Sequence, residues 1–82
     1  MKLAILRRTV FQGDDVRRPV AVVLAKRVDV REYATFLQDQ DGSMYAGLYS
    51  RDYEAAFGEY EMRCRNASSV NDPGKEISEV KL

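Results

Sequence analysis

The first part of the chain carries hydrophobic residues at the spacing typical of β-strands. Residues 2–11 are rich in β-branched and aromatic side chains and predict a strand. A polar loop follows over residues 12–18, and Pro19 can begin the next strand, where its missing N–H does least harm. Alternate residues are then apolar and predict a second strand that forms a hairpin with the first: Val20, Val22, Leu24, Val28 and Val30.

The segment Asp29–Gln40 fits two structures. Its first residue, followed three positions later by Glu32, has the form of a helix capping box, and Gly42 is suited to end a helix. In such a helix, however, Asp39 and Asp41 would lie at the negative end of the helix dipole. The segment also contains several β-prone residues. The pattern favours a strand, with the helix as the alternative.

The stretch Phe36–Tyr49, FLQDQDGSMYAGLY, contains a D-x-D-G sequence that suggests either a calcium loop or a hairpin turn. In a calcium loop with Gly42 at position 6, the first and last ligand positions would fall on leucines, which cannot bind the ion. Asp-Gly between two β-prone segments instead predicts a two-residue type I′ hairpin turn. The residue pairs expected across this hairpin are Gln38–Tyr45, Phe36–Gly47 and Ala34–Tyr49.

After Tyr49 the apolar spacing changes to that of an α-helix. Ser50 is a suitable N-cap, Asp52 and Glu54 suit the first helical turn, and the helix is expected to end near Asn66. One apolar stripe is expected to face the sheet: Tyr53, Ala56, Phe57, Tyr60 and Cys64.

These elements predict one small α+β domain over residues 1–82. Its expected architecture is an antiparallel β-meander of three to five strands, with one C-terminal helix packed on one face. Residues 67–82 contain a turn and predict a loose tail or a short edge strand. One cysteine, the lack of a long apolar run and the lack of a signal-peptide pattern predict a cytoplasmic location, in the host cell if the protein is phage-encoded.

Charge is unevenly distributed, although the net charge of the whole chain is +0. Residues 1–31 contain eight basic and three acidic side chains, whereas residues 32–82 contain five basic and ten acidic ones. Within residues 32–61, Arg51 is the only basic residue against seven carboxylates, and all five tyrosines lie in the same window. Such asymmetry indicates a surface that binds a charged partner.

Residues typical of catalysis are scarce. The chain has no histidine, which is the commonest general base and metal ligand. Cys64 lies on the predicted helix stripe, where a buried thiol is inert. No glycine-rich phosphate loop is present. The sequence therefore predicts a protein that is not an enzyme and has no catalytic residues, no cofactor and no metal site.

The basic N-terminal region suggests an alternative site. Its paired basic residues could line a phosphate-binding face on the first hairpin, although neighbours in a strand point to opposite sides of the sheet. The arginines of this alternative are Arg7, Arg8, Arg17 and Arg18. The alternative function is therefore a nucleic-acid-binding module, or a small accessory homo-oligomeric module, that uses this basic hairpin. In the homo-oligomeric module, exposed strand edges would pair across a dimer.

The run Glu32–Arg63, EYATFLQDQDGSMYAGLYSRDYEAAFGEYEMR, resembles a pattern of very small phage proteins: an aromatic strand, D-x-D-G, a strand with tyrosine and glycine, and a helix with an E-A-x-x-x-aromatic-E pattern. The chain is similar in size and order of elements to phage anti-defence proteins, and to anti-CRISPRs in particular. That resemblance implies stoichiometric binding to a larger bacterial protein, such as a CRISPR nuclease complex, that blocks a nucleic-acid path.

An acidic and aromatic surface suits that function, because a row of carboxylates resembles the phosphates of nucleic acid and tyrosines are enriched at binding hot spots. We therefore expect protein–protein binding and no membrane partner, with direct binding of nucleic acid as the less favoured alternative. The expected partner-binding residues are Asp39, Asp41, Tyr45, Tyr49, Asp52, Glu54, Glu59 and Glu61.

Overall fold

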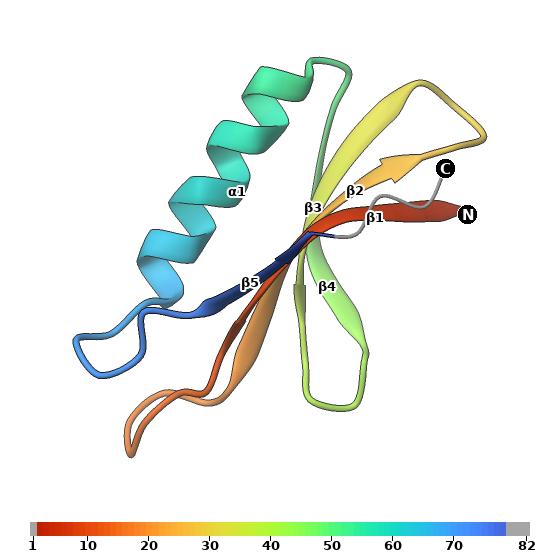
Figure 1. Cartoon of the computed structure of the whole chain (residues 1–82). Helices are drawn as coiled ribbons and strands as arrows, with labels where there is room; N and C mark the ends of the chain where they lie inside the picture. The colour runs from red at the N-terminus through yellow and green to blue at the C-terminus, as the bar shows by residue number, and fades with distance from the viewer. Residues whose placement is uncertain (1, 79–82) are drawn as a thin grey trace.

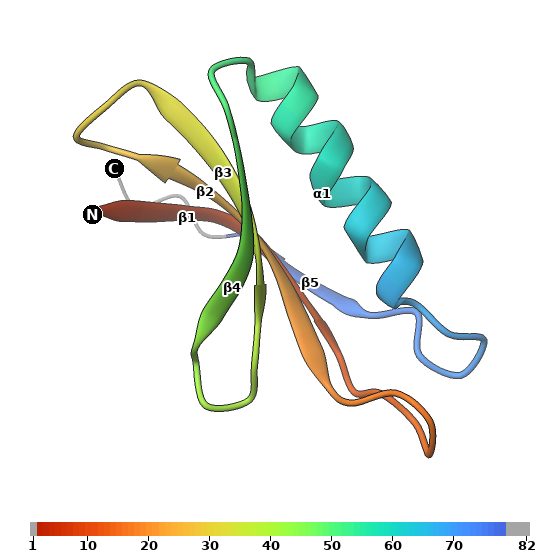
Figure 2. The same cartoon turned by 180° about the vertical axis from the view of Figure 1, so that it is seen from behind.

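Five antiparallel strands form one sheet, and a single helix packs against one of its faces (Figure 1; seen from behind in Figure 2). The computed structural model describes residues 2–78. The strand order is β4-β3-β2-β1-β5, so the first four strands form a meander, and the predicted α+β class is confirmed. The elements are β1 Leu3–Phe11, β2 Val20–Arg27, β3 Glu32–Gln38, β4 Met44–Ser50, α1 Tyr53–Ala67 and β5 Lys75–Ser78.

The larger part of the core lies between the sheet and α1. Side chains alternate between the two faces of a strand, so Val22 and Leu24 of β2 point toward the helix. There they pack with Phe11 of β1 and with Ala56 and Tyr60 of α1, and all five residues are buried. This layer fixes α1 over the middle of the sheet.

A second cluster lies on the face opposite the helix. Val23 and Ala25, the alternate residues of β2, are fully buried there with Ala34 of β3. Phe36 completes the cluster and packs edge-on against Tyr49 of β4, with the ring centroids 5.9 Å apart. Both faces of the central strands are therefore apolar, which explains the near-continuous hydrophobic run in β2.

The helix begins two residues later than an N-cap at Ser50 would require. Asp52 is the N-cap, and its carboxylate accepts a hydrogen bond from the Glu54 N–H. The Ser50 hydroxyl instead accepts a hydrogen bond from the Asp52 N–H, so the prediction of Ser50 as the cap is wrong. An ionised carboxylate is the better cap here, because it also interacts favourably with the positive end of the helix dipole.

The second strand is shorter than its alternating pattern predicts. β2 ends at Arg27, and Val28 and Val30 lie exposed in the turn that leads to β3. An ion pair between Arg27 and Glu32, 2.6 Å apart, closes this turn. The segment that was ambiguous between strand and helix contains β3, so the strand prediction is confirmed over residues 32–38.

The D-x-D-G stretch forms the predicted hairpin, but not with the predicted two-residue turn. The loop has three residues between Asp39 and Ser43. The Asp39 N–H donates a hydrogen bond to the Ser43 carbonyl at 2.9 Å. Only Gly42 has a positive φ, 91°, whereas a type I′ turn needs two such residues. The loop is instead a type I turn followed by Gly42 in the left-handed conformation, which needs a positive φ at one residue only.

The longer loop changes the strand register. Gln38 pairs with Met44 rather than with Tyr45, which was expected opposite it, so that prediction is wrong. A bulge around Ala46, whose φ is 55°, then inserts one residue and restores the expected pairing of Ala34 with Tyr49. The Phe36 ring lies over Gly47, as expected: a Cβ atom at this glycine would lie 2.9 Å from it.

After α1 the chain turns back to the sheet. Gly74, with a φ of 84°, precedes β5, which pairs with β1. Part of the C-terminal segment is therefore a short edge strand, and residues 79–82 of the predicted tail lie outside the described residues. In the part of the chain described here, no helix combines the length and apolar character needed to cross a membrane.

Candidate functional site

The eight residues expected to bind a partner lie at the surface. Seven of them are exposed, and Glu59 is half-buried. Asp39 and Asp41 are in the β3–β4 loop, Tyr45 and Tyr49 are on β4, and the others cap or belong to α1. They do not form one continuous patch.

The helix carboxylates point to two sides of α1. Glu59 forms an ion pair with Arg63, 3.6 Å away, and the Arg63 guanidinium donates a hydrogen bond to the Ala46 carbonyl of β4. Glu61 instead lines a hollow on the β1–β5 side together with Arg7 and Arg65. Glu59 therefore belongs to the β4 side of the helix, and Glu61 to the opposite side.

The two tyrosines of β4 lie on opposite faces of the sheet. Tyr45 pairs with Leu37 and faces the helix side, where it lines a groove with α1. Tyr49 packs against Phe36 on the other face, and the Arg27 guanidinium lies 5.8 Å from its ring centre. The bulge at Ala46 separates the two tyrosines in this way, because it changes which residues share a face.

The groove that Tyr45 lines is the place where several expected residues meet. It has a volume of about 680 Å³ and lies between the C-terminal part of α1, the β1–β2 loop and the β3–β4 loop. Its walls combine apolar groups with Arg18, Asp39 and Arg63. A groove of this size with a few polar groups is suited to bind a side chain of a partner protein.

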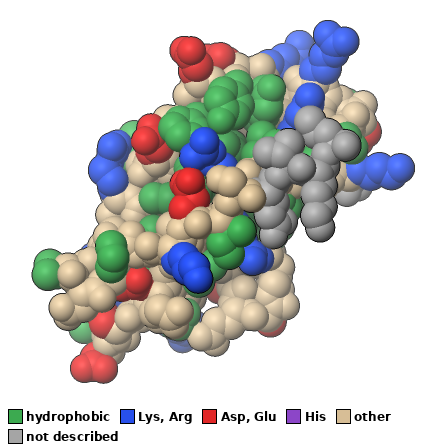
Figure 3. Space-filling view, viewed as in Figure 1, with side chains coloured by type: hydrophobic (Ala, Val, Ile, Leu, Met, Phe, Trp, Pro, Cys, Tyr) green, Lys and Arg blue, Asp and Glu red, His purple; other side chains and the backbone are tan. Residues whose placement is uncertain are grey.

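Acidic and basic candidates are close together at this end of the sheet. Arg18 shares a second hollow with Asp39 and Asp41, so the tip of the β3–β4 hairpin lies beside the β1–β2 loop. Figure 3 shows the same mixture elsewhere, since red and blue side chains are interspersed over the face in view. The charge separation along the sequence is thus partly mixed by folding.

Three carboxylates of the candidate surface have no role in the internal contacts of residues 2–78. Asp39, Glu54 and Glu61 take part in none of the ion pairs there. Asp41 accepts a hydrogen bond from the Ser43 N–H, and this bond lowers the pKa of Asp41 below its ordinary value. This hydrogen bond favours the ionised form of the Asp41 carboxylate.

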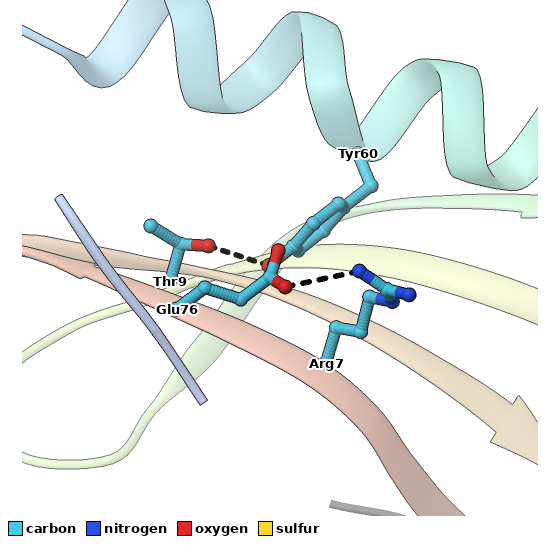
Figure 4. A network of polar contacts seen from close by, with 4 residues as sticks. All are labelled: Arg7, Thr9, Tyr60 and Glu76. Carbon is cyan, nitrogen blue, oxygen red and sulfur yellow. Dashed lines mark hydrogen bonds and ion pairs between the residues drawn. The ribbon is translucent and has the colours of Figure 1, made fainter. Parts of the chain in front are cut away.

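Two of the four arginines of the alternative site have structural contacts. Arg7 lies over the Phe57 ring and pairs with Glu76 of β5 at 2.9 Å (Figure 4). Arg17 donates hydrogen bonds to the carbonyls of Asn66 and Ser68 at the end of α1. Such contacts complement the negative C-terminus of a helix.

The other two alternative arginines line neighbouring hollows that share Asp39. Arg8 lines one on the face away from the helix, and Arg18, in the β1–β2 loop, lines the other. As expected for neighbours in a strand, Arg7 and Arg8 point to opposite faces. The four arginines do not make one basic face.

The described residues contain little that supports bond-making chemistry. Burial raises the pKa of the Cys64 thiol, which keeps it protonated and a poor nucleophile. Among residues 2–78, no group of three or more His, Cys, Asp or Glu side chains is arranged to hold a metal ion.

Sequence reasoning missed two features of the surface. Arg63 joins α1 to the β4 bulge, a contact that the helical spacing does not indicate. Arg27, Arg31 and Arg51 line one pocket at the β2–β3 turn, with a volume of about 750 Å³. Arg51 is far from Arg27 and Arg31 in the sequence, so the cluster could not be predicted from it. The pairing of β2, β3 and β4 brings the three arginines together.

Comparisons with known proteins give no relative from which roles can be transferred. No protein-family model matches the chain, and neither curated proteins nor solved structures gave a significant match. The functional argument therefore depends on the surface itself.

Proposed function

We propose that the protein binds a basic surface of a larger bacterial protein stoichiometrically, as an inhibitor of the anti-CRISPR type that blocks a nucleic-acid path. The contact surface is the β3–β4 hairpin tip, the adjacent groove and the exposed side of α1. The supporting observation is that three exposed carboxylates, Asp39, Glu54 and Glu61, form no ion pair within residues 2–78 and are available to a partner. Two of the four alternative arginines, Arg7 and Arg17, are already in contact with Glu76 and with the end of α1.

The carboxylates guide association and the groove provides a local contact. Exposed charges at the rim of an interface mainly increase the rate of association with an oppositely charged partner. Tyr45, which is 44% exposed at the groove, offers aromatic area with few rotatable bonds to lose on binding. An aromatic side chain of the partner can enter between Tyr45 and Leu37, which line the same groove.

The direct experiment is inhibition of target-DNA cleavage by purified CRISPR effector complexes of several types. We expect cleavage by one type to stop at a fixed molar ratio of inhibitor to effector, with no turnover. Glu54→Lys combined with Glu61→Lys should weaken this inhibition. Asp15→Lys is the matched control, since it reverses an exposed charge in the β1–β2 loop that does not line the groove.

Two results would contradict the proposal. One is inhibition at amounts far below the effector concentration, which would indicate catalysis. The other is an absence of inhibition and of binding for every effector type tested.

A further inference from the structure

The two edges of the sheet differ in length and charge. β5 has four residues, including Lys75 and Glu76, whereas β4 has seven residues, MYAGLYS, with no charge and no proline. Natural edge strands are usually short, charged or interrupted by proline, because an open row of N–H and C=O groups pairs readily with another strand. Within residues 2–78, the only strand that pairs with β4 is β3. β4 is therefore the edge that is open to a further strand.

The side chains of this edge are also largely exposed to solvent. Met44, Tyr45, Leu48 and Tyr49 are between 36% and 49% exposed. Four large apolar side chains on one strand are unusual for a solvated edge. A neighbouring strand would cover part of each of them.

The bulge determines which part of β4 can pair regularly. Ala46 interrupts the strand, and beyond it the register with β3 is regular through Leu48, Tyr49 and Ser50. A strand added to the outer edge would therefore centre on this C-terminal part. Leu48 lies within this part.

Opposite charges flank the uncharged strand at its two ends. Asp39 and Asp41 lie in the loop before β4. Arg51 follows it and lines one pocket with Arg27 and Arg31, in which Glu32 is the only carboxylate. An antiparallel copy of the same strand would place each acidic end beside the other copy's arginines.

We propose that β4 pairs with β4 of a second copy of this chain, antiparallel about a two-fold axis at Leu48. Leu48 then lies opposite its own counterpart, and Gly47 lies opposite Tyr49, a pairing in which an aromatic ring covers a strand glycine. Arg51 of each copy then lies opposite Tyr45 of the other, on the side of the axis where the other copy's Asp41 lies, so each end of the paired strands joins an arginine and an acidic hairpin tip. The two sheets become one, with both α1 helices on the same face. This dimer does not depend on the proposed inhibitory function.

Analytical ultracentrifugation of the full chain tests the pairing. The wild-type protein should show a concentration-dependent monomer–dimer equilibrium. Leu48→Lys should raise the dimer dissociation constant about tenfold or more, because two lysines would face each other across the axis. Met62→Lys is the matched control, since Met62 is 48% exposed on α1 and Leu48 is 49% exposed. It should leave the constant unchanged.

A charge exchange tests the direction of pairing. Asp41→Lys alone and Arg51→Glu alone should each weaken self-association, since both contacts then join like charges. A mixture of the two variants should form a heterodimer, because each contact again joins opposite charges. A substitution that only damaged the β3–β4 turn would not allow this heterodimer to form, so its formation excludes that explanation. If Asp41→Lys does not fold, Asp39→Lys takes its place.

The outcomes separate this dimer from other occupants of the edge. A wild-type chain that stays monomeric up to about 1 mM would overturn the proposal, because a Kd weaker than this corresponds to less than about 4 kcal/mol. So would a dimer that Leu48→Lys leaves intact, or a mixture of charge variants that stays monomeric. Binding of an extended peptide from another protein by a monomer would assign the edge to that peptide instead.

Discussion

The hydroxyl of Tyr60 should contribute about 2 kcal/mol to the stability of the fold. It lies in the core under α1, 2.5 Å from the Thr9 hydroxyl, and donates a hydrogen bond to Glu76 at 3.3 Å (Figure 4). Tyr60 is 2% exposed and Thr9 is 6% exposed, so their hydrogen bond is largely shielded from water. Tyr60→Phe therefore leaves the Thr9 hydroxyl buried without its partner, which costs about 1–3 kcal/mol.

A double-mutant cycle isolates this interaction. Thr9→Val should cost about 1 kcal/mol, because Tyr60 retains the weaker bond to Glu76. The double variant should be less destabilised than the two single variants together, by about 1–2 kcal/mol, since it has neither unpaired hydroxyl. A chain of this length is stabilised by roughly 4–12 kcal/mol in total, so the effects are measurable.

Urea unfolding followed by circular dichroism is the assay, because the chain has no tryptophan to report unfolding by fluorescence. Strict additivity of the two substitutions would refute the reasoning. A Tyr60→Phe variant as stable as the wild type would refute it too.

Four further stability effects are expected. Gly58→Ala should stabilise the protein by about 1 kcal/mol, measured by urea unfolding, since a Cβ there meets nothing within 4 Å and helical glycine is unfavourable; a loss would contradict this. Thr35→Val should raise the melting temperature, because the Thr35 hydroxyl is buried without a hydrogen-bond partner, and removing it should gain about 1 kcal/mol; a lower melting temperature would show a hidden partner. Gly74→Ala should lower the melting temperature, because a Cβ would lie 2.5 Å from the Phe11 ring at a φ of 84°, and an unchanged value would mean that the loop adapts. Burial raises the pKa of both Tyr60 and Cys64, so the unfolded chain loses these protons first, near their ordinary values of 10.0 and 9.0. The free energy of unfolding should therefore fall as pH rises above about 9. The double variant Tyr60→Phe/Cys64→Ala should make this fall less steep, and an equally steep fall would assign it to other groups.

The elements could be predicted because their periodicity is strong. The helix stripe repeats at helical spacing, and the burial of Ala56 and Tyr60 agrees with it. Phe57 is only half-buried, so Phe57→Ala should cost less than the 3–5 kcal/mol of a fully buried phenylalanine. Exposure of the helix carboxylates could likewise be predicted, since the positions off the stripe face solvent.

The details of the β3–β4 hairpin could not be predicted. Asp-Gly suits both a two-residue turn and the three-residue loop that is present, and no residue type marks the bulge at Ala46. A one-residue change in register moves a side chain to the other face of the sheet. Tyr45 was expected on the same face as Tyr49 and instead lies on the helix side, which is why the surface is divided.

Binding through carboxylates can be distinguished most directly from binding through arginines by charge reversal in the cleavage assay. Asp39→Lys, Glu54→Lys and Glu61→Lys would be compared with Arg8→Glu and Arg18→Glu, at low and moderate salt. The carboxylate reversals should each slow association with the effector, with a smaller effect as salt rises, and the arginine reversals should leave inhibition nearly unchanged. Loss of inhibition in the arginine variants, with full inhibition by all three carboxylate variants, would contradict recognition through the acidic surface.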